Sequence, residues 1–227
     1  DPVAGGFYTV REAARLLDIT NSGVIAAWLK GQRGGRGAGP VVRRQYEPIG
    51  KVQELGFLDL MEVRFIEHFR KQDYSLQSLR KAADVARAEL KVDHPYALFG
   101  VKFIGERKNI FLEVAKAEGD RKLLNLITKQ FAIYEVLENV LEHGIVFDPT
   151  SGLAQRWKPR DKAFPHVVID PTIAYGQPTI EGTRVTTDAI FSSWKAENGD
   201  IDAVAEWFEV DKGLAKEAVE FELALPK

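Results

Sequence analysis

The chain has 227 residues, of which 45% are hydrophobic and 28% charged, an ordinary mixture for a globular protein. It contains no cysteine, which excludes disulfides, thiolate zinc sites and cysteine nucleophiles and suits a reducing compartment. No apolar run approaches the roughly 18 residues that span a bilayer, and we find no secretory signal. We therefore expect a cytoplasmic protein with no membrane segment.

The charge is distributed unevenly along the chain, although the net charge is only −2. Residues 1–114 hold 18 Lys and Arg against 14 Asp and Glu, whereas residues 115–227 hold 13 against 19. A basic front half suits a polyanion, and an acidic back half needs a different kind of partner.

The first 46 residues predict two short helices joined by a tight turn, which is a helix-turn-helix. Thr9 and Glu12 form a capping box for a helix over Val10–Leu17, and Thr20 or Asn21 caps a second helix that ends near Leu29. The glycine-rich segment 30–39 buries too little for a helix or packed strand. After this loop, the return strand of a short hairpin is expected at Val41, Val42 and Tyr46.

The middle of the chain predicts more helices and one hairpin. Helical periodicity indicates Phe57–Lys71, Leu76–Leu90 and Leu123–His143. Alternation predicts a hairpin of Ala97–Ile104 with Asn109–Val114.

The last third predicts a linker followed by a small helical module. Residues 147–165 are polar and rich in Pro and Gly, so we place the linker there. A strand at His166–Asp170 follows, and then three helices near Thr187–Glu197, Asp200–Phe208 and Lys212–Leu223. The predicted fold class is mainly α with small β hairpins, with domains at residues 7–146 and 166–227.

A DNA surface is expected on the second helix and the loop after it. A recognition helix presents its first turns to base edges, and arginines among glycines suit a phosphate backbone. The alternatives stay open that Asn21 and Ser22 are only helix caps and that the loop is merely solvated. The predicted DNA-binding residues are Asn21, Ser22, Lys30, Arg33, Arg36, Arg43 and Arg44. We expect a homodimer on an inverted repeat, with the stripe Phe131–Leu141 as a candidate seam.

Two stretches resemble known families. Tyr8–Leu17 (YTVREAARLL), the Trp-containing second helix and the Gly/Arg loop resemble the opening of a MerR-type winged helix, and Leu55–Ile66 resembles the segment after that opening in a subset of those proteins. The motifs Ile169-Asp-Pro171, Gly176-Gln-Pro-Thr-Ile180 and Gly182-Thr-Arg-Val185 resemble a small antitoxin-associated domain of unknown function. Such domains are commonly encoded beside a PIN-like nuclease, and longer versions that carry an N-terminal DNA-binding domain are classed as VapB-type antitoxins.

The resemblance implies a type II antitoxin that binds its operator, represses its own operon and neutralises a PIN-like ribonuclease toxin. It implies an N-terminal winged helix-turn-helix, a C-terminal three-helix, homeodomain-like module, and no cofactor. One alternative is a transcriptional regulator whose back half senses a small ligand, and another is a structural adaptor with no DNA role.

We expect neither catalysis nor metal binding, because no His or carboxylate set has a suitable spacing. The segment 147–165 instead offers a Trp flanked by cations, the composition of an interface anchor. The predicted toxin-binding residues are Arg156, Trp157, Lys158 and Arg160. Trp157 could equally pack against the adjacent domain. The acidic face of Glu206, Glu209, Glu217 and Glu220 is another candidate surface. The glycine loop from Gly176 to Val185 could be a folding motif or an anion site.

Overall fold

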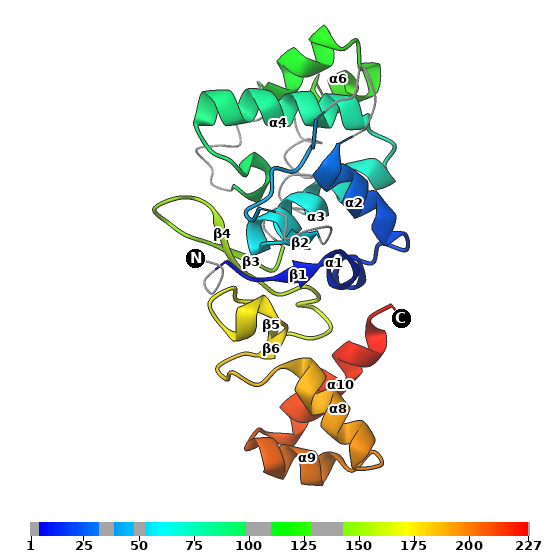
Figure 1. Cartoon of the computed structure of the whole chain (residues 1–227), viewed down its shortest axis with the longest axis vertical. Helices are drawn as coiled ribbons and strands as arrows, with labels where there is room; N and C mark the ends of the chain where they lie inside the picture. The colour runs from blue at the N-terminus through cyan, green and yellow to red at the C-terminus, as the bar shows by residue number, and fades with distance from the viewer. Residues whose placement is uncertain (1–4, 32–38, 48–52, 99–109, 129–142, 227) are drawn as a thin grey trace.

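Helices dominate the structure, a computed structural model that describes residues 5–31, 39–47, 53–98, 110–128 and 143–226 (Figure 1). In this part of the chain the strands form three two-stranded antiparallel sheets. The predicted mainly α class with small antiparallel sheets is therefore confirmed. None of the described helices is long and apolar enough to cross a membrane.

The two N-terminal helices form as predicted. Strand β1 (Tyr8–Thr9) leads into α1 (Val10–Leu16), where Thr9 and Glu12 make the capping box. Helix α2 (Ser22–Lys30) starts at Asn21, whose side chain accepts a hydrogen bond from the N–H of Gly23 at 3.0 Å. Helix α1 packs against α2, and strand β2 (Glu54–Leu55) returns to pair with β1.

The predicted return strand is wrong. Residues 39–47 contain no strand, and Val41 and Val42 are fully buried. Their N–H groups donate to the carbonyl of Trp28 at 3.0 and 3.4 Å. Because they satisfy the open C-terminal end of α2, the two valines cap a helix rather than extend a hairpin.

Helices α3 (Phe57–Lys71) and α4 (Leu76–Leu90) are as predicted and are followed by a short 3-10 helix, η1 (Pro95–Ala97). Residues 110–117 are helical, so the predicted second strand, Asn109–Val114, is wrong. Ile110, Phe111, Val114 and Ala115 are buried, and their spacing also fits one face of a helix. Phe111 stacks on Tyr96, with ring centroids 6.2 Å apart.

Helix α6 (Arg121–Thr128) starts two residues before the predicted helix. The remainder of that predicted helix up to residue 142, including the candidate dimer seam Phe131–Leu141, lies outside the described residues.

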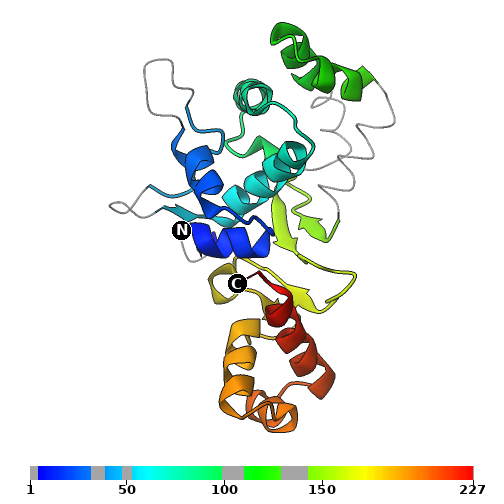
Figure 2. The same ribbon diagram turned by 90° about the vertical axis from the view of Figure 1, so that its right-hand side faces the viewer.

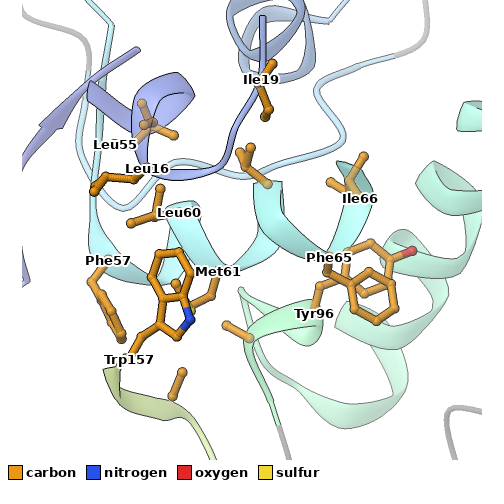
Figure 3. Packing of buried hydrophobic residues seen from close by; sticks show 14 of the residues in the cluster. Leu16, Ile19, Leu55, Phe57, Leu60, Met61, Phe65, Ile66, Tyr96 and Trp157 are labelled. Atoms are coloured by element: carbon orange, nitrogen blue, oxygen red, sulfur yellow. The ribbon is translucent and has the colours of Figure 1, made fainter. Parts of the chain in front are cut away.

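The segment predicted as a linker is folded. Strands β3 (Ile145–Phe147) and β4 (Ala154–Trp157) form a hairpin, and the side chain of Trp157 is only 3% exposed. Figure 3 shows the indole beside Phe57 and Met61 of α3. The backbone of Trp157 also exchanges hydrogen bonds with Ile169 at 2.9 and 2.8 Å. Residue 157 therefore connects the core of the front half to the C-terminal module.

The C-terminal module contains strands β5 (Val167–Val168) and β6 (Thr179–Ile180), a 3-10 turn η2 (Ala174–Gly176) and three helices. These are α8 (Thr187–Ala196), α9 (Ile201–Phe208) and α10 (Lys212–Ala224), capped by Thr186, Asp200 and Asp211. All three predicted helices are confirmed. Helix α10 packs against both α8 and α9.

We expect Trp157→Ala to destabilise the fold by about 3–5 kcal/mol, because it leaves a large cavity beside α3. Trp207→Ala is the matched control, since Trp207 is 80% exposed and little packing is lost there. Chemical denaturation of both variants measures the difference. Equal stabilities would show that the Trp157 indole does not support the core.

Candidate functional site

The surface of α2 offers few groups that could read a base. Asn21, Gly23, Ala27 and Lys30 are exposed, whereas Ile25, Trp28 and Leu29 are buried. Ser22 is half-buried. The Asn21 oxygen is engaged in the cap, so its amide N–H₂ is the group left to contact a partner. The small residues Gly23 and Ala27 leave room for close approach, with Lys30 at the end of the same helix.

The predicted arginines fall into three groups. Arg33 and Arg36 lie outside the described residues. Arg43 is exposed and pairs with Asp93 at 3.3 Å. An exposed pair of this kind contributes little and exchanges readily for a phosphate. Arg44 is half-buried, and its Nη1 is buried without a hydrogen-bond partner among the described residues. Of the two described arginines in this set, Arg43 is therefore the better placed to contact a polyanion.

A cluster of buried charged side chains fixes residues 41–45, which follow the glycine-rich segment 30–39. The carboxylate of Asp59, on α3, accepts hydrogen bonds from the N–H of Gln45 at 3.0 Å and of Gly56 at 2.8 Å. Arg87, on α4, donates to the carbonyl of Val41 at 2.9 Å. Residues 41–45 are thus tied to α3 and α4 through polar groups, in addition to the packing of the two valines.

The cluster is charge-balanced only when a proton is present. Two fully buried carboxylates, Asp59 and Glu62, face one guanidinium, Arg87, and the imidazole of His94. The pKa of Asp59 is raised to about 6 by burial, against the opposing charge of His94. Burial alone lowers the pKa of His94, but Glu62 at 3.6 Å and Asp59 at 3.5 Å outweigh it and raise that pKa. Low pH therefore favours the native cluster.

Sequence reasoning missed this cluster, although a signal existed. Asp59 and Glu62 fall among the apolar positions Leu60, Met61 and Val63 of the predicted helix Phe57–Lys71, where a carboxylate is unusual. Among the described residues, no three His, Asp or Glu side chains gather as a metal site.

The predicted toxin-binding residues are mostly used inside the molecule. Trp157 is buried, and Lys158 pairs with Glu181 at 2.6 Å. Arg160 donates to Asp18 at 2.8 Å and to the carbonyl of Ala224 at 2.8 Å, so it clamps the α1–α2 turn to the end of α10. Of these four residues, Arg156 alone is exposed. This arrangement favours the alternative that Trp157 packs against the neighbouring part of the chain.

The glycine motif docks the C-terminal module onto the front half. The buried hydroxyl of Tyr8 donates to the carbonyl of Gly176 at 2.8 Å, and the N–H of Phe7 donates to the carbonyl of Tyr175 at 2.8 Å. Ala174, Tyr175 and Gly176 all have left-handed backbone, with φ of 47°, 55° and 80°. A Cβ on Gly176 would lie 2.3 Å from the Tyr8 hydroxyl. These contacts support a folding role for this part of the motif.

A cleft of about 340 Å³ lies beside this junction. It is lined by α1, residues 177–178, the start of α8 and the end of α10. Most of its polar groups already have protein partners: Glu12 caps α1, Thr186 caps α8, and Arg15 bonds Pro226 and pairs with Glu222. The cleft therefore offers a small ligand few free polar groups.

We expect Gly176→Ala to destabilise the protein by about 1–3 kcal/mol more than Gly182→Ala, because only the first breaks a buried hydrogen bond. Both positions have a φ of 80°, so both variants carry the same backbone strain, but a Cβ on Gly182 meets no atom within 4 Å. Thermal unfolding measures the two losses. Equal losses of stability in the two variants would mean that the hydrogen bond from Tyr8 to Gly176 does not stabilise the junction.

The charge cluster makes stability depend on pH. A His with a raised pKa stabilises the fold fully below its unfolded pKa of about 6.5, and this contribution is lost as pH rises through its higher folded pKa. Burial raises the pKa of Asp59 from 3.8 to about 6, so protonated Asp59 adds stability that is lost as pH rises between these two values. We expect the melting temperature to fall as pH rises from about 5 to about 8, and His94→Gln to flatten the upper part of that fall.

His68→Gln is the control for this pH profile. Burial, with Arg64 and Lys71 nearby, lowers the pKa of His68, so its contribution has the opposite sign. This variant should not flatten the fall. Parallel profiles for the parent protein and His94→Gln would contradict the charge-balance argument.

Both halves of the chain are similar in sequence to known proteins. Residues 167–221 match the family model "Protein of unknown function (DUF433)". The chain is 23% identical over 227 residues to "Putative antitoxin VapB45" of Mycobacterium tuberculosis (strain ATCC 25618 / H37Rv), across 94% of this chain and 92% of that protein.

A crystal structure, of Rv2018 from Mycobacterium tuberculosis, matches with a TM-score of 0.68 at 21% identity and covers 93% of this chain and 96% of that one. At this identity the match shows a shared fold. The chain is therefore a distant homologue of the protein named "Putative antitoxin VapB45" and carries a DUF433 domain at residues 167–221.

Proposed function

We propose that this protein is the antitoxin of a type II toxin–antitoxin pair, which binds operator DNA and neutralises a PIN-like ribonuclease. The observation that carries the proposal is the relationship to "Putative antitoxin VapB45", which extends over 94% of the chain and so includes both the α1–α2 pair and the DUF433 domain. An antitoxin acts by binding, so this role requires neither a catalytic residue nor a cofactor. Such a pair acts in the cytoplasm, where its RNA and operator are found.

The DNA-binding half is proposed to be a MerR-like winged helix-turn-helix. Helices α1 and α2 are packed together, as the motif requires, and β2 returns beside β1 before α3 begins. In this assignment α2 enters the major groove, and the cations of residues 30–44, which we call the wing although its described part 39–44 holds no strand, contact the phosphate backbone. The exposed Lys30 and Arg43 lie at the two ends of this segment. The cluster around Asp59 and Arg87 supports the assignment because it gives the wing a fixed base.

The toxin-binding half is proposed to be the C-terminal module. Residues 166–227 hold 12 Asp and Glu against five Lys and Arg, a charge that disfavours contact with DNA. The effector-sensing alternative has weaker support, since most polar groups in the cleft beside α1 have protein partners.

Operator binding is tested by mobility shift on the DNA upstream of the gene, at several salt concentrations. We expect Arg33→Ala/Arg36→Ala/Arg43→Ala to weaken binding to every duplex and to reduce the slope of log K against log salt by about one for each lost phosphate contact. Arg44 is left in place because it is half-buried.

Lys216→Ala is the control for this experiment, since it removes a cation from α10, where Lys216 pairs with Glu220. Its slope should equal that of the parent protein. An unchanged slope in the triple variant would remove the wing from the DNA interface. Toxin binding is tested by co-purification with the nuclease encoded by the neighbouring gene, and the lack of a complex would overturn the antitoxin assignment.

A further inference from the structure

Trp207 is the most exposed large hydrophobic side chain in the described part of the protein. It lies on α9 and is 80% exposed, whereas Trp28 and Trp157 are buried and Trp194 is half-buried with its ring N–H bonded to the carbonyl of Gly199. An aromatic ring left in water loses the burial that normally stabilises it, and such rings serve as anchors at protein interfaces.

Several carboxylates lie near Trp207 in the sequence of α9 and at the start of α10. Glu206 and Glu209 are exposed, and neither pairs with a cation among the described residues. Asp200 and Asp211 cap the starts of α9 and α10, and Lys212 is already paired with Asp202 at 2.7 Å. We call this surface, made of Asp202, Glu206, Trp207, Glu209 and Asp211, the acidic α9 surface.

The acidic α9 surface is separated from the proposed DNA interface. In both Figure 1 and Figure 2, α1 lies between α2 and the C-terminal helices, and α9 is at the end of the molecule away from α4 and α6. A partner that contacts α9 alone therefore leaves α2 uncovered.

The charge pattern selects the kind of partner. A second copy of this chain would bring two acidic surfaces together, which like-charge repulsion disfavours. A basic surface is favoured instead. An enzyme that acts on RNA needs such a surface, because it must neutralise phosphates with Lys and Arg and often stacks unpaired bases on aromatic rings.

We propose that the acidic α9 surface occupies the RNA-binding groove of the ribonuclease toxin as a mimic of the substrate. This inference rests on the proposed antitoxin function and adds where and how the toxin is bound. The carboxylates of Glu206 and Glu209 take the place of phosphates opposite the toxin's cations, with charge-assisted hydrogen bonds to Lys or Arg. The indole of Trp207 takes the place of a stacked base. Inhibition then arises from exclusion of RNA.

The test is calorimetric titration of the full-length protein with the purified nuclease encoded by the neighbouring gene. We expect Trp207→Ala to raise the dissociation constant about 30-fold or more, the loss expected of an aromatic interface anchor. We expect Glu206→Gln/Glu209→Gln to weaken binding and to reduce its dependence on salt. Single-stranded RNA, added with a chelator to prevent cleavage, should compete with the parent protein for the nuclease.

Two variants serve as matched controls. Leu223→Ala removes another exposed apolar side chain, 60% exposed, from α10. Glu89→Gln/Glu113→Gln removes the same number of charges from exposed positions of the front half. Both controls should bind the nuclease like the parent, and all variants should melt near the parent temperature, because the altered side chains are exposed.

The outcomes separate this inference from the proposed function. If the parent protein does not bind the nuclease, the antitoxin assignment is overturned and the inference falls with it. If the parent binds, but Trp207→Ala and the double Gln variant bind equally well, or RNA fails to compete, the substrate-mimic inference alone is overturned. Loss of binding in the α9 variants, with unchanged controls and competition by RNA, supports it.

Discussion

Trp157 contacts both the front half and the C-terminal module, and these contacts fix how the two are arranged. Its indole is buried beside α3, while its N–H and carbonyl bond to Ile169 directly after β5. A displacement of the C-terminal module therefore has to break two backbone hydrogen bonds or expose a large aromatic side chain. Arg160 adds a second connection, between the α1–α2 turn and the end of α10. These contacts give the two halves a defined mutual position.

A defined position has consequences for the proposed roles. The helix proposed to bind DNA and the helix proposed to bind the toxin lie on different sides of the junction, so the two proposed contact surfaces do not overlap. Any influence of one partner on the other must pass through the junction, since α1 lies between α2 and the C-terminal helices. On the proposed DNA side, the buried cluster fixes the chain at the C-terminal end of residues 30–44, because Val41 and Gln45 are bonded to groups on α4 and α3.

The sequence is informative where the signal is local. Capping residues predict the helix starts at Thr9 and Asn21, and the spacing of apolar residues predicts the helices that follow. The strand prediction within residues 110–117 is wrong because a short amphipathic helix and a strand place apolar residues at overlapping positions. The sequence does not decide between packing and partner binding for Trp157, since the residues of α3 that bury it lie far away in sequence. The DNA and toxin contacts remain predictions, because a sequence shows a partner only through charge and exposure.

The junction also explains how a fold can persist while its sequence changes. Among the described residues, many hydrogen bonds at this junction end on main-chain carbonyls, including those of Phe7, Trp157, Ile169, Tyr175, Gly176, Ala224 and Pro226. A carbonyl is present whatever side chain the residue carries, so substitution leaves the acceptor itself in place, although at Gly176 a Cβ would also meet the Tyr8 hydroxyl. The donors, such as Tyr8, Arg15 and Arg160, have to be kept or replaced by other donors. A junction built in this way tolerates extensive divergence, as expected of two proteins that share a fold at 21% identity.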